Sequence, residues 1–345
     1  MPTKVLIVTD AWYPQTNGVV RSLSAMGREL ARRGIVTTYL TPERFWTVPV
    51  PTYPEIRLSL TPIGAVGHII DEDMPDHIHI ATEGPLGLQA RLHCADTGLR
   101  FTTSFHTRFP EYVAARVPVP PDWSYAYLRW FHADAATTLV PTASMLAELE
   151  ERGFTHLKLW SRGVDAELFS PGPKNRFLDL PGPHLLYVGR VAPEKNVEAF
   201  LKTDMPGTKI VVGDGPQREE LQHRYPDAVF LGYQFGEELA SLYRSADVFV
   251  FPSLTDTFGN VMVEAMASGV PVAAYPVTGP RDVLTENAGA MDADLGIAIA
   301  RALRLPRPAA RARAESFTWK VSGDQFLSAL VPAEGPRHHR FAKAS

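Results

Sequence analysis

The sequence predicts two α/β domains that each contain a parallel sheet and that face one another across a cleft. A short apolar run rich in β-branched residues, 4–10, precedes a segment, 18–34, whose apolar residues fall on one face of a helix. The same alternation restarts after a stretch rich in proline and glycine, 169–184. A chain of 345 residues has room for two cores at roughly 100–200 residues per domain. An interface between two such domains is a preferred place for a ligand.

Each further element is expected from its own local pattern. Apolar runs bounded by turn residues predict strands at 77–82, 100–107, 137–140, 184–190, 209–214, 228–233, 248–253 and 270–275. Helical periodicity predicts helices at 143–152, 217–225, 236–246 and 318–330. The expected organisation is a first domain at 1–168, a linker at 169–184, a second domain at 185–318, and a final helix and tail at 319–345 that pack back toward the first domain.

Composition excludes several classes of protein. A net charge of −4 gives no general attraction to nucleic acid, so no nucleic-acid partner is expected. The single cysteine, Cys94, cannot form a disulfide within the chain, and we expect it to be a small buried hydrophobic side chain. The apolar run near the N-terminus is too short for a signal peptide or a membrane span. We therefore expect a cytoplasmic protein. It can still bind peripherally to the inner face of the cell membrane.

The segment from Asp256 to Glu264 has the features of an anion site. A helix N-terminus offers unpaired N–H groups and a partial positive charge, and Gly259 lets a bulky anion approach the backbone. Glu264 falls in the second turn, where a carboxylate can accept hydrogen bonds from a diol such as a ribose. The alternative is a helix capped by Thr257 or Asn260, with Glu264 in solvent.

Two cations follow the first strand of the second domain. Arg190 leaves the end of this strand, and Lys195 stands at the head of the next helix, so both would lie at the carboxyl edge of a parallel sheet. There they could neutralise a leaving diphosphate without a metal ion. The alternative is a pair of surface cations, one of them paired with Glu194. A second tight turn, Gly213–Asp214, either supports a nucleotide base from below or has no ligand role.

The first domain offers fewer candidates. Asn17–Gly18 lies between a strand and a helix, where Gly18 allows close approach of a phosphate or an acceptor. The pattern is not G-x-G-x-x-G, so hydride transfer with NAD has no support. His106 follows a strand and could contact the acceptor or carry a proton, with Arg108 nearby. A structural role for His106 is the alternative.

Together these motifs resemble glycosyltransferase family 4, the retaining enzymes of GT-B fold with two Rossmann-like domains. The most specific match is the E-x7-E pattern, here Asp256-x7-Glu264, joined by Arg190 and Lys195 and by "RGVD" at 162–165. The first acidic residue is Asp rather than Glu. That form is similar to a subgroup of sulfoquinovosyl, glucuronosyl and mannosyl transferases that act on lipids.

The resemblance implies a role for each candidate residue in a hexosyltransferase that uses a UDP- or GDP-sugar and no metal. It implies that Arg190 and Lys195 stabilise the departing diphosphate and that Asp256 acts at the reacting sugar. His106 would approach the reacting centre, and Asn17 and Arg108 the acceptor. The implied donor-binding residues are Gly18, Gly189, Gly213, Asp214, Phe258, Gly259, Asn260 and Glu264.

The sequence gives less information about the acceptor than about the donor. The segment 108–135 mixes Trp123, Trp130 and other aromatic residues with Arg108, Arg116 and Arg129, a combination that suits a membrane interface. A membrane lipid such as diacylglycerol is therefore the expected acceptor. Packing of these aromatic side chains in the core is the alternative. A soluble or polysaccharide acceptor, and a module that binds nucleotide sugars without catalysis, also remain open.

Overall fold

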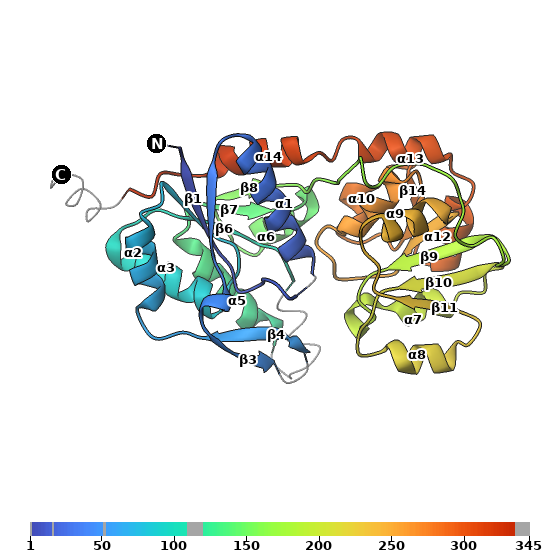
Figure 1. Ribbon diagram of the computed structural model, residues 1–345, viewed down its shortest axis with the longest axis horizontal. Helices are drawn as coiled ribbons and strands as arrows, with labels where there is room; N and C mark the ends of the chain where they lie inside the picture. Colours follow the sequence, from blue (N-terminus) through green and yellow to red (C-terminus); the bar gives the residue numbers. More distant parts are fainter. Residues whose placement is uncertain (1, 16, 51–52, 109–119, 335–345) are drawn as a thin grey trace. The chain divides into compact units, whose positions relative to one another are not determined.

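The computed structural model describes residues 2–15, 17–50, 53–108 and 120–334, and its chain divides into two compact units (Figure 1). Unit 1 contains Met1–Ser161 and Trp319–Ser345, and unit 2 contains Arg162–Thr318. Each unit holds a six-stranded parallel sheet in the described part of the chain, as the α/β prediction requires.

The sheet of unit 1 has the strand order β2-β1-β5-β6-β7-β8. Its strands are β1 (Lys4–Val8), β2 (Val36–Leu40), β5 (His77–Ile80), β6 (Thr102–Ser104), β7 (Thr137–Val140) and β8 (Leu157–Leu159). Its helices are α1 (Gly18–Arg32), α2 (Ala65–Asp73), α3 (Pro85–Thr97), α5 (Pro121–Ala133), α6 (Ala143–Glu151) and α14 (Trp319–Ala329).

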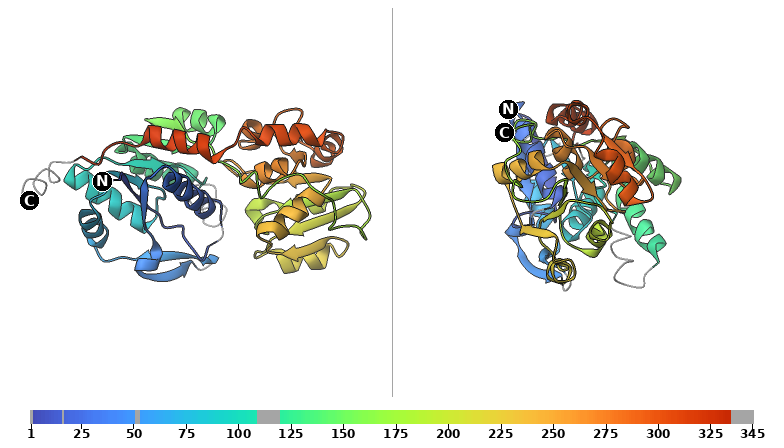
Figure 2. Two further views of the ribbon diagram at one scale, coloured as in Figure 1. Left: turned by 45° about the horizontal axis from the view of Figure 1, so that its top comes forward. Right: turned by 90° about the vertical axis from the view of Figure 1, so that its right-hand side faces the viewer.

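Helices cover both faces of this sheet because its strands carry apolar residues on both faces. Leu6 and Val8 of β1 pack with α2 and α3, whereas Val5 and Ile7 pack with α1 and α14. Figure 2 shows α14 beside α1 in unit 1, and Phe326 from α14 is fully buried in that core. Cys94 is also fully buried, as expected, and burial raises the pKa of its thiol to about 12.

A separate antiparallel hairpin interrupts unit 1 between β2 and α2. Its strands are β3 (Trp46–Val50) and β4 (Tyr53–Leu60), with Trp46 opposite Leu60 and Val48 opposite Leu58. The sequence analysis did not predict it, because Pro49 and its neighbouring prolines argue against a central strand. Proline is tolerated here because each strand has a free edge.

Unit 2 has the strand order β11-β10-β9-β12-β13-β14. Its strands are β9 (His184–Val188), β10 (Thr208–Val212), β11 (Val229–Gly232), β12 (Val248–Phe251), β13 (Val272–Ala274) and β14 (Gly289–Met291). Its helices are α7 (Val197–Leu201), α8 (Arg218–Arg224), α9 (Gly236–Ser245), α10 (Asn260–Ala267), α11 (Pro280–Val283), α12 (Leu295–Ala302) and α13 (Arg307–Ala314), with a 3₁₀ turn η2 (Pro193–Lys195). The residues of β9 alternate between two apolar clusters, so this sheet is also covered on both faces.

The division between the units falls at Ser161–Arg162, earlier than the expected boundary at 168. The expected linker, 169–184, belongs to unit 2, because Phe169 and Phe177 are buried in the core of that unit. Proline and glycine therefore mark an irregular segment packed on unit 2 rather than a free connection.

Candidate active site

The strand order of unit 2 reverses between β9 and β12, which are direct neighbours in the sheet. In open α/β sheets ligands bind outside the carboxyl ends of the strands at such a switch point. Arg190 follows β9 at this edge, and the loop that contains Asp256 follows β12. The fold therefore brings two sequence-distant candidates to the position where the sheet favours a ligand.

Lys195 and Asp256 form an ion pair at this switch point. The Lys195 Nζ atom donates to Asp256 Oδ1 at 2.6 Å, and both side chains are about four-fifths buried (22% and 19% exposed). The other carboxylate oxygen, Oδ2, is buried and has no hydrogen-bond partner in the described part of the chain. A buried acceptor without a donor is costly, so this oxygen is suited to a hydroxyl of a bound ligand. In the alternative, one of the two cations paired with Glu194; in the structure Lys195 pairs with Asp256.

The start of α10 is shaped by Gly259. This residue has φ +82°, and a Cβ atom there would lie 2.8 Å from Met262 Cε and 2.9 Å from Phe251 Cζ. The N-cap residue of α10 is Gly259, rather than Thr257 or Asn260 as in the alternative. Gly259 has no side chain, so the N-cap residue itself offers no side-chain oxygen to the first N–H groups at the anion-binding end of the helix. The Phe258 side chain is buried against Phe317, so it supports this loop from the core rather than lining an open surface.

Glu264 is buried, not solvated. It is 5% exposed, and its Oε2 atom accepts a hydrogen bond from the Tyr243 hydroxyl on α9 at 3.0 Å. A buried carboxylate needs such donors to offset the loss of hydration. The sequence analysis missed Tyr243, because a tyrosine on an amphipathic helix carries no signal that it meets a carboxylate on another helix.

The glycines after β9 and β10 are required by the packing of the backbone. A Cβ atom at Gly213 would lie 1.9 Å from the carbonyl oxygen of Gly189, and both residues have positive φ. Asp214 accepts from the backbone N–H of Gly215 and from Arg218 Nη1, each at 2.7 Å. The alternative of a structural turn accounts for these contacts, and a role toward a base stays a prediction.

The candidates of unit 1 are held by local contacts. Asn17 Oδ1 accepts from Val19 N and Val20 N at 3.0 Å and so caps α1, which begins at Gly18. Both terminal nitrogens of Arg108 donate to the carboxylate of Glu148 on α6.

His106 is half-buried just after β6. Its Nε2 atom lies 2.8 Å from Ser104 Oγ, and its ring packs edge-on against Trp160. Its predicted contact with the acceptor stays untested.

The aromatic segment before β7 packs partly inward. Tyr125 and Phe131 are buried. Trp123 and Trp130 are exposed, at 74% and 45%, and the guanidinium of Arg91 lies 3.8 Å from the ring centre of Trp130. Arg116 lies outside the described residues. Core packing, the alternative, thus explains Tyr125 and Phe131 but not the two tryptophans.

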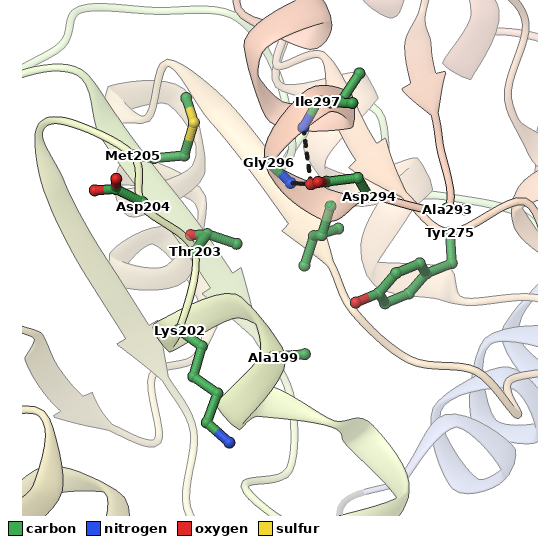
Figure 3. Close-up of a pocket in the computed structure, with 11 residues that line it drawn as sticks. Ala199, Lys202, Thr203, Asp204, Met205, Tyr275, Ala293, Asp294, Gly296 and Ile297 are labelled. Atoms are coloured by element: carbon green, nitrogen blue, oxygen red, sulfur yellow. Dashed lines mark hydrogen bonds between the residues drawn. The ribbon is translucent and has the colours of Figure 1, made fainter.

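A pocket of about 600 Å³ lies elsewhere in unit 2, between α7 and the start of α12 (Figure 3). Asp294 Oδ1 caps α12 by accepting from Gly296 N and Ile297 N, and Tyr275 faces the pocket from the end of β13. None of the residues predicted for the site lines it. Among the described residues no group of three or more His, Cys, Asp or Glu side chains could hold a metal ion.

Two family models match the chain, one in each unit. Residues 16–168 match Glycosyltransferase Family 4, and residues 182–304 match Glycosyl transferases group 1. A GDP-mannose-dependent alpha-mannosyltransferase of Mycobacterium tuberculosis is 32% identical, over 82% of this chain and 81% of its own length. The chain belongs to glycosyltransferase family 4. This family 4 member is therefore a transferase enzyme, as the motifs around Lys195 and Glu264 predicted.

Other similar proteins agree with this assignment. The sulfoquinovosyl transferase SQD2 of Arabidopsis thaliana is 34% identical, over 78% of this chain and 57% of its own length. Sucrose-phosphate synthase of Thermosynechococcus elongatus matches 99% of this chain and all of its own, with a TM-score of 0.77 and 22% identity. That likeness confirms the GT-B fold.

Proposed function

We propose that this enzyme transfers a hexose, with retention of configuration, from a nucleoside-diphosphate sugar to a hydroxyl group of a membrane lipid. The observation that carries the proposal is the Lys195–Asp256 pair, with its unpartnered carboxylate oxygen, at the switch point of unit 2. Family 4 membership makes a nucleotide sugar the ligand class to place there.

The roles of the donor residues follow from charge. As the bond between C1 of the sugar and the phosphate oxygen breaks, its electrons move to the diphosphate, whose growing charge Lys195 and Arg190 would stabilise. Asp256 Oδ2 would accept a hydroxyl of the sugar, and the N–H groups at the start of α10 would face a phosphate. Before the transfer, the acceptor hydroxyl would donate its hydrogen bond to His106, which orients it. As the acceptor oxygen forms the new bond to C1 on the same face, this hydrogen bond would break and the proton would pass to the departing diphosphate.

The donor to test first is GDP-mannose. Three of the similar proteins, at 31–33% identity, are GDP-mannose-dependent alpha-mannosyltransferases. The solved structure of HepE from Anabaena, which is 16% identical, contains UDP-glucose, so UDP-sugars belong in the same panel. No step of the proposed reaction requires a metal ion, and a chelator should leave the rate unchanged.

The test is product formation from labelled GDP-mannose, UDP-glucose and UDP-glucuronate on vesicles that contain diacylglycerol. Asp256→Asn should lower the rate strongly, whereas Asp204→Asn, an exposed carboxylate at the separate pocket, should leave it unchanged. Donor binding without product from any sugar on any acceptor would favour a non-catalytic binding module. Product on a soluble glycan but not on lipid would correct the acceptor alone.

A lipid acceptor is supported by one similar protein and by one surface. An alpha-monoglucosyldiacylglycerol synthase of Streptococcus pneumoniae is 24% identical over 79% of this chain. On the β3–β4 hairpin, the opposed pairs Trp46–Leu60 and Val48–Leu58 are 40% to 88% exposed, whereas Ser59, on the other face of β4, is buried. An exposed apolar face with a tryptophan is suited to the headgroup region of a bilayer. No helix in the described residues is long and apolar enough to cross a membrane.

We therefore propose peripheral binding to the membrane through this hairpin. The double variant Trp46→Ser, Leu60→Ser should lose sedimentation with anionic vesicles, whereas Trp123→Ser, which removes another exposed indole, from α5, should keep it. Loss only with Trp123→Ser would move the binding surface to α5, and loss with neither variant would contradict peripheral binding through either surface.

A further inference from the structure

The arginine-rich helix α13 lies beside α10 in unit 2 (Figure 1), and the mechanism proposed above does not use it. Its Arg313 is half-buried, and no carboxylate pairs with it among the described residues. Arg313 Nε donates to Val283 O at 2.8 Å, and Nη2 donates to Asp282 O at 2.9 Å. These are the last two carbonyl groups of α11, so Arg313 holds the C-terminal end of that short helix. Its Nη1 atom donates to Ser316 Oγ at 3.4 Å.

The other end of α11 packs against the loop that carries Asp256. The N-cap residue of α11 is Gly279, with φ +90°. A Cβ atom at this position would lie 3.0 Å from Asp256 O and 3.3 Å from Phe258 O, closer than an ordinary contact. The backbone of the loop therefore rests directly on the start of α11, where the positive φ and the close approach both favour glycine.

Arg313 also supports this loop through the ring of Phe317. The Arg313 Cζ atom lies 4.7 Å from the ring centre of Phe317. Phe258 packs edge-on against Phe317, with ring centres 5.7 Å apart, and both rings are buried. Val164 N donates to Phe317 O at 3.0 Å, so the backbone that carries the ring is fixed as well. Cation–π and edge-to-face contacts both favour particular ring positions, so Phe258 is anchored in the core beside Gly259.

We infer that Arg313 is a positioning residue that fixes the loop 256–259 through Phe317 and through α11. A site carried by a loop loses precision when the contacts beneath the loop are removed. The inference rests on the proposed function for its consequence on donor binding and rate, because this loop carries Asp256 and ends at the N-cap of α10. The position of the loop itself is a property of the protein without substrate.

The competing explanation is that Arg313 merely stabilises unit 2. Arg307, the first residue of α13, provides a matched control because it also binds backbone carbonyl groups. It donates to the carbonyl oxygens of Ala246, Arg244 and Ser268, at 2.7, 2.9 and 3.4 Å. These groups lie at the C-terminal ends of α9 and α10, away from the start of α10. A loss of stability alone should therefore affect Arg307→Gln and Arg313→Gln alike.

Hydrogen exchange of the whole protein, measured by mass spectrometry, reads the loop directly. Arg313→Gln should speed exchange about tenfold in the peptide that covers residues 254–262, whereas Arg307→Gln should leave this peptide close to wild type. In titrations with GDP and UDP, Arg313→Gln should weaken the binding of the nucleotide about three- to tenfold, because the loop must be ordered on binding. On lipid vesicles, Arg313→Gln should lower kcat about tenfold through the misplaced Asp256.

Phe317→Leu keeps the inference testable if Arg313→Gln does not fold. It removes the ring contact while Arg313 keeps its bonds to α11, so it should also speed exchange in residues 254–262. Wild-type exchange in Arg313→Gln or Phe317→Leu, or an equal acceleration in Arg307→Gln, would overturn the inference. Faster exchange in Arg313→Gln with unchanged nucleotide binding would support the positioning by Arg313 and would contradict the placement of the nucleotide at this loop.

Discussion

The two units have switch points built from the same kind of sheet, but the side chains at the two switch points make different contacts. In unit 1 the order reverses between β1 and β5, and Asp10 follows β1 there. Asp10 accepts from Leu86 N and Gly87 N at the start of α3 and from the Thr82 hydroxyl, at 2.9, 3.3 and 2.9 Å. The chain thus fills this helix N-terminus with its own carboxylate.

The corresponding position in unit 2 has different side-chain contacts. The N-cap residue of α10 is Gly259, which has no side chain, and the carboxylate of Asp256 pairs with Lys195. One buried carboxylate oxygen keeps its capacity to accept, in the described part of the chain. The comparison teaches that the parallel sheet supplies a place for an anion, and that the local side chains decide whether the protein closes it or leaves it for a ligand.

The largest effect is expected from removing the cation at the open switch point. Lys195→Ala should lower kcat about 10²- to 10³-fold, because the charge that develops on the leaving diphosphate loses a preorganised partner. Lys202→Ala is the matched control, since Lys202 is an exposed lysine that pairs with Glu198 at the other pocket. Steady-state rates of both variants on lipid vesicles measure the difference, and equal rates would remove Lys195 from the mechanism.

The next effect concerns the buried carboxylate of α10. Tyr243→Phe leaves Glu264 without this donor, and we expect the free energy of unfolding to fall by about 1–3 kcal/mol. Tyr225→Phe removes a tyrosine–glutamate bond that is more exposed, to Glu198 at 3.1 Å, and should cost less. Urea unfolding compares the two. A larger loss in Tyr225→Phe would show that Glu264 does not depend on Tyr243.

Because Asp10 is buried at the unit 1 switch point, the free energy of unfolding should depend on pH. Burial outweighs the hydrogen bonds and raises the pKa of Asp10 above its usual value near 3.8. The folded state then binds a proton more tightly than the unfolded state, so the free energy of unfolding falls as pH rises from about 4 through the raised pKa. Asp10→Asn should flatten this dependence in thermal melts across pH. A steeper slope in the variant would show that the pKa is lowered instead.

The smallest effect is expected at Cys94, which should not react with a thiol reagent in the folded protein. With a pKa of about 12 and no exposure, Cys94 should resist a thiol reagent at pH 8 in the native protein and react fully in denaturant. The change in absorbance after the reagent is added measures the extent of the reaction. Rapid labelling of the native protein would show that the core around α3 opens readily.

The sequence predicted the strands and helices with a clear apolar period, and it predicted family 4 from Asp256-x7-Glu264. It did not predict the β3–β4 hairpin, because its prolines argue against strands. The Lys195–Asp256 contact depends on β9 and β12 being neighbours, and strand order is set by packing over the whole sheet rather than by either segment.

The most direct test of the comparison is calorimetric titration of the whole protein with GDP and with UDP. If the open switch point of unit 2 binds the diphosphate, one nucleotide should bind with a stoichiometry of one, Lys195→Ala should weaken it at least about tenfold (~1.4 kcal/mol), and Asp10→Asn should leave it unchanged. Equal affinity in wild type and Lys195→Ala, or loss of binding in Asp10→Asn, would contradict the assignment of the nucleotide to this site.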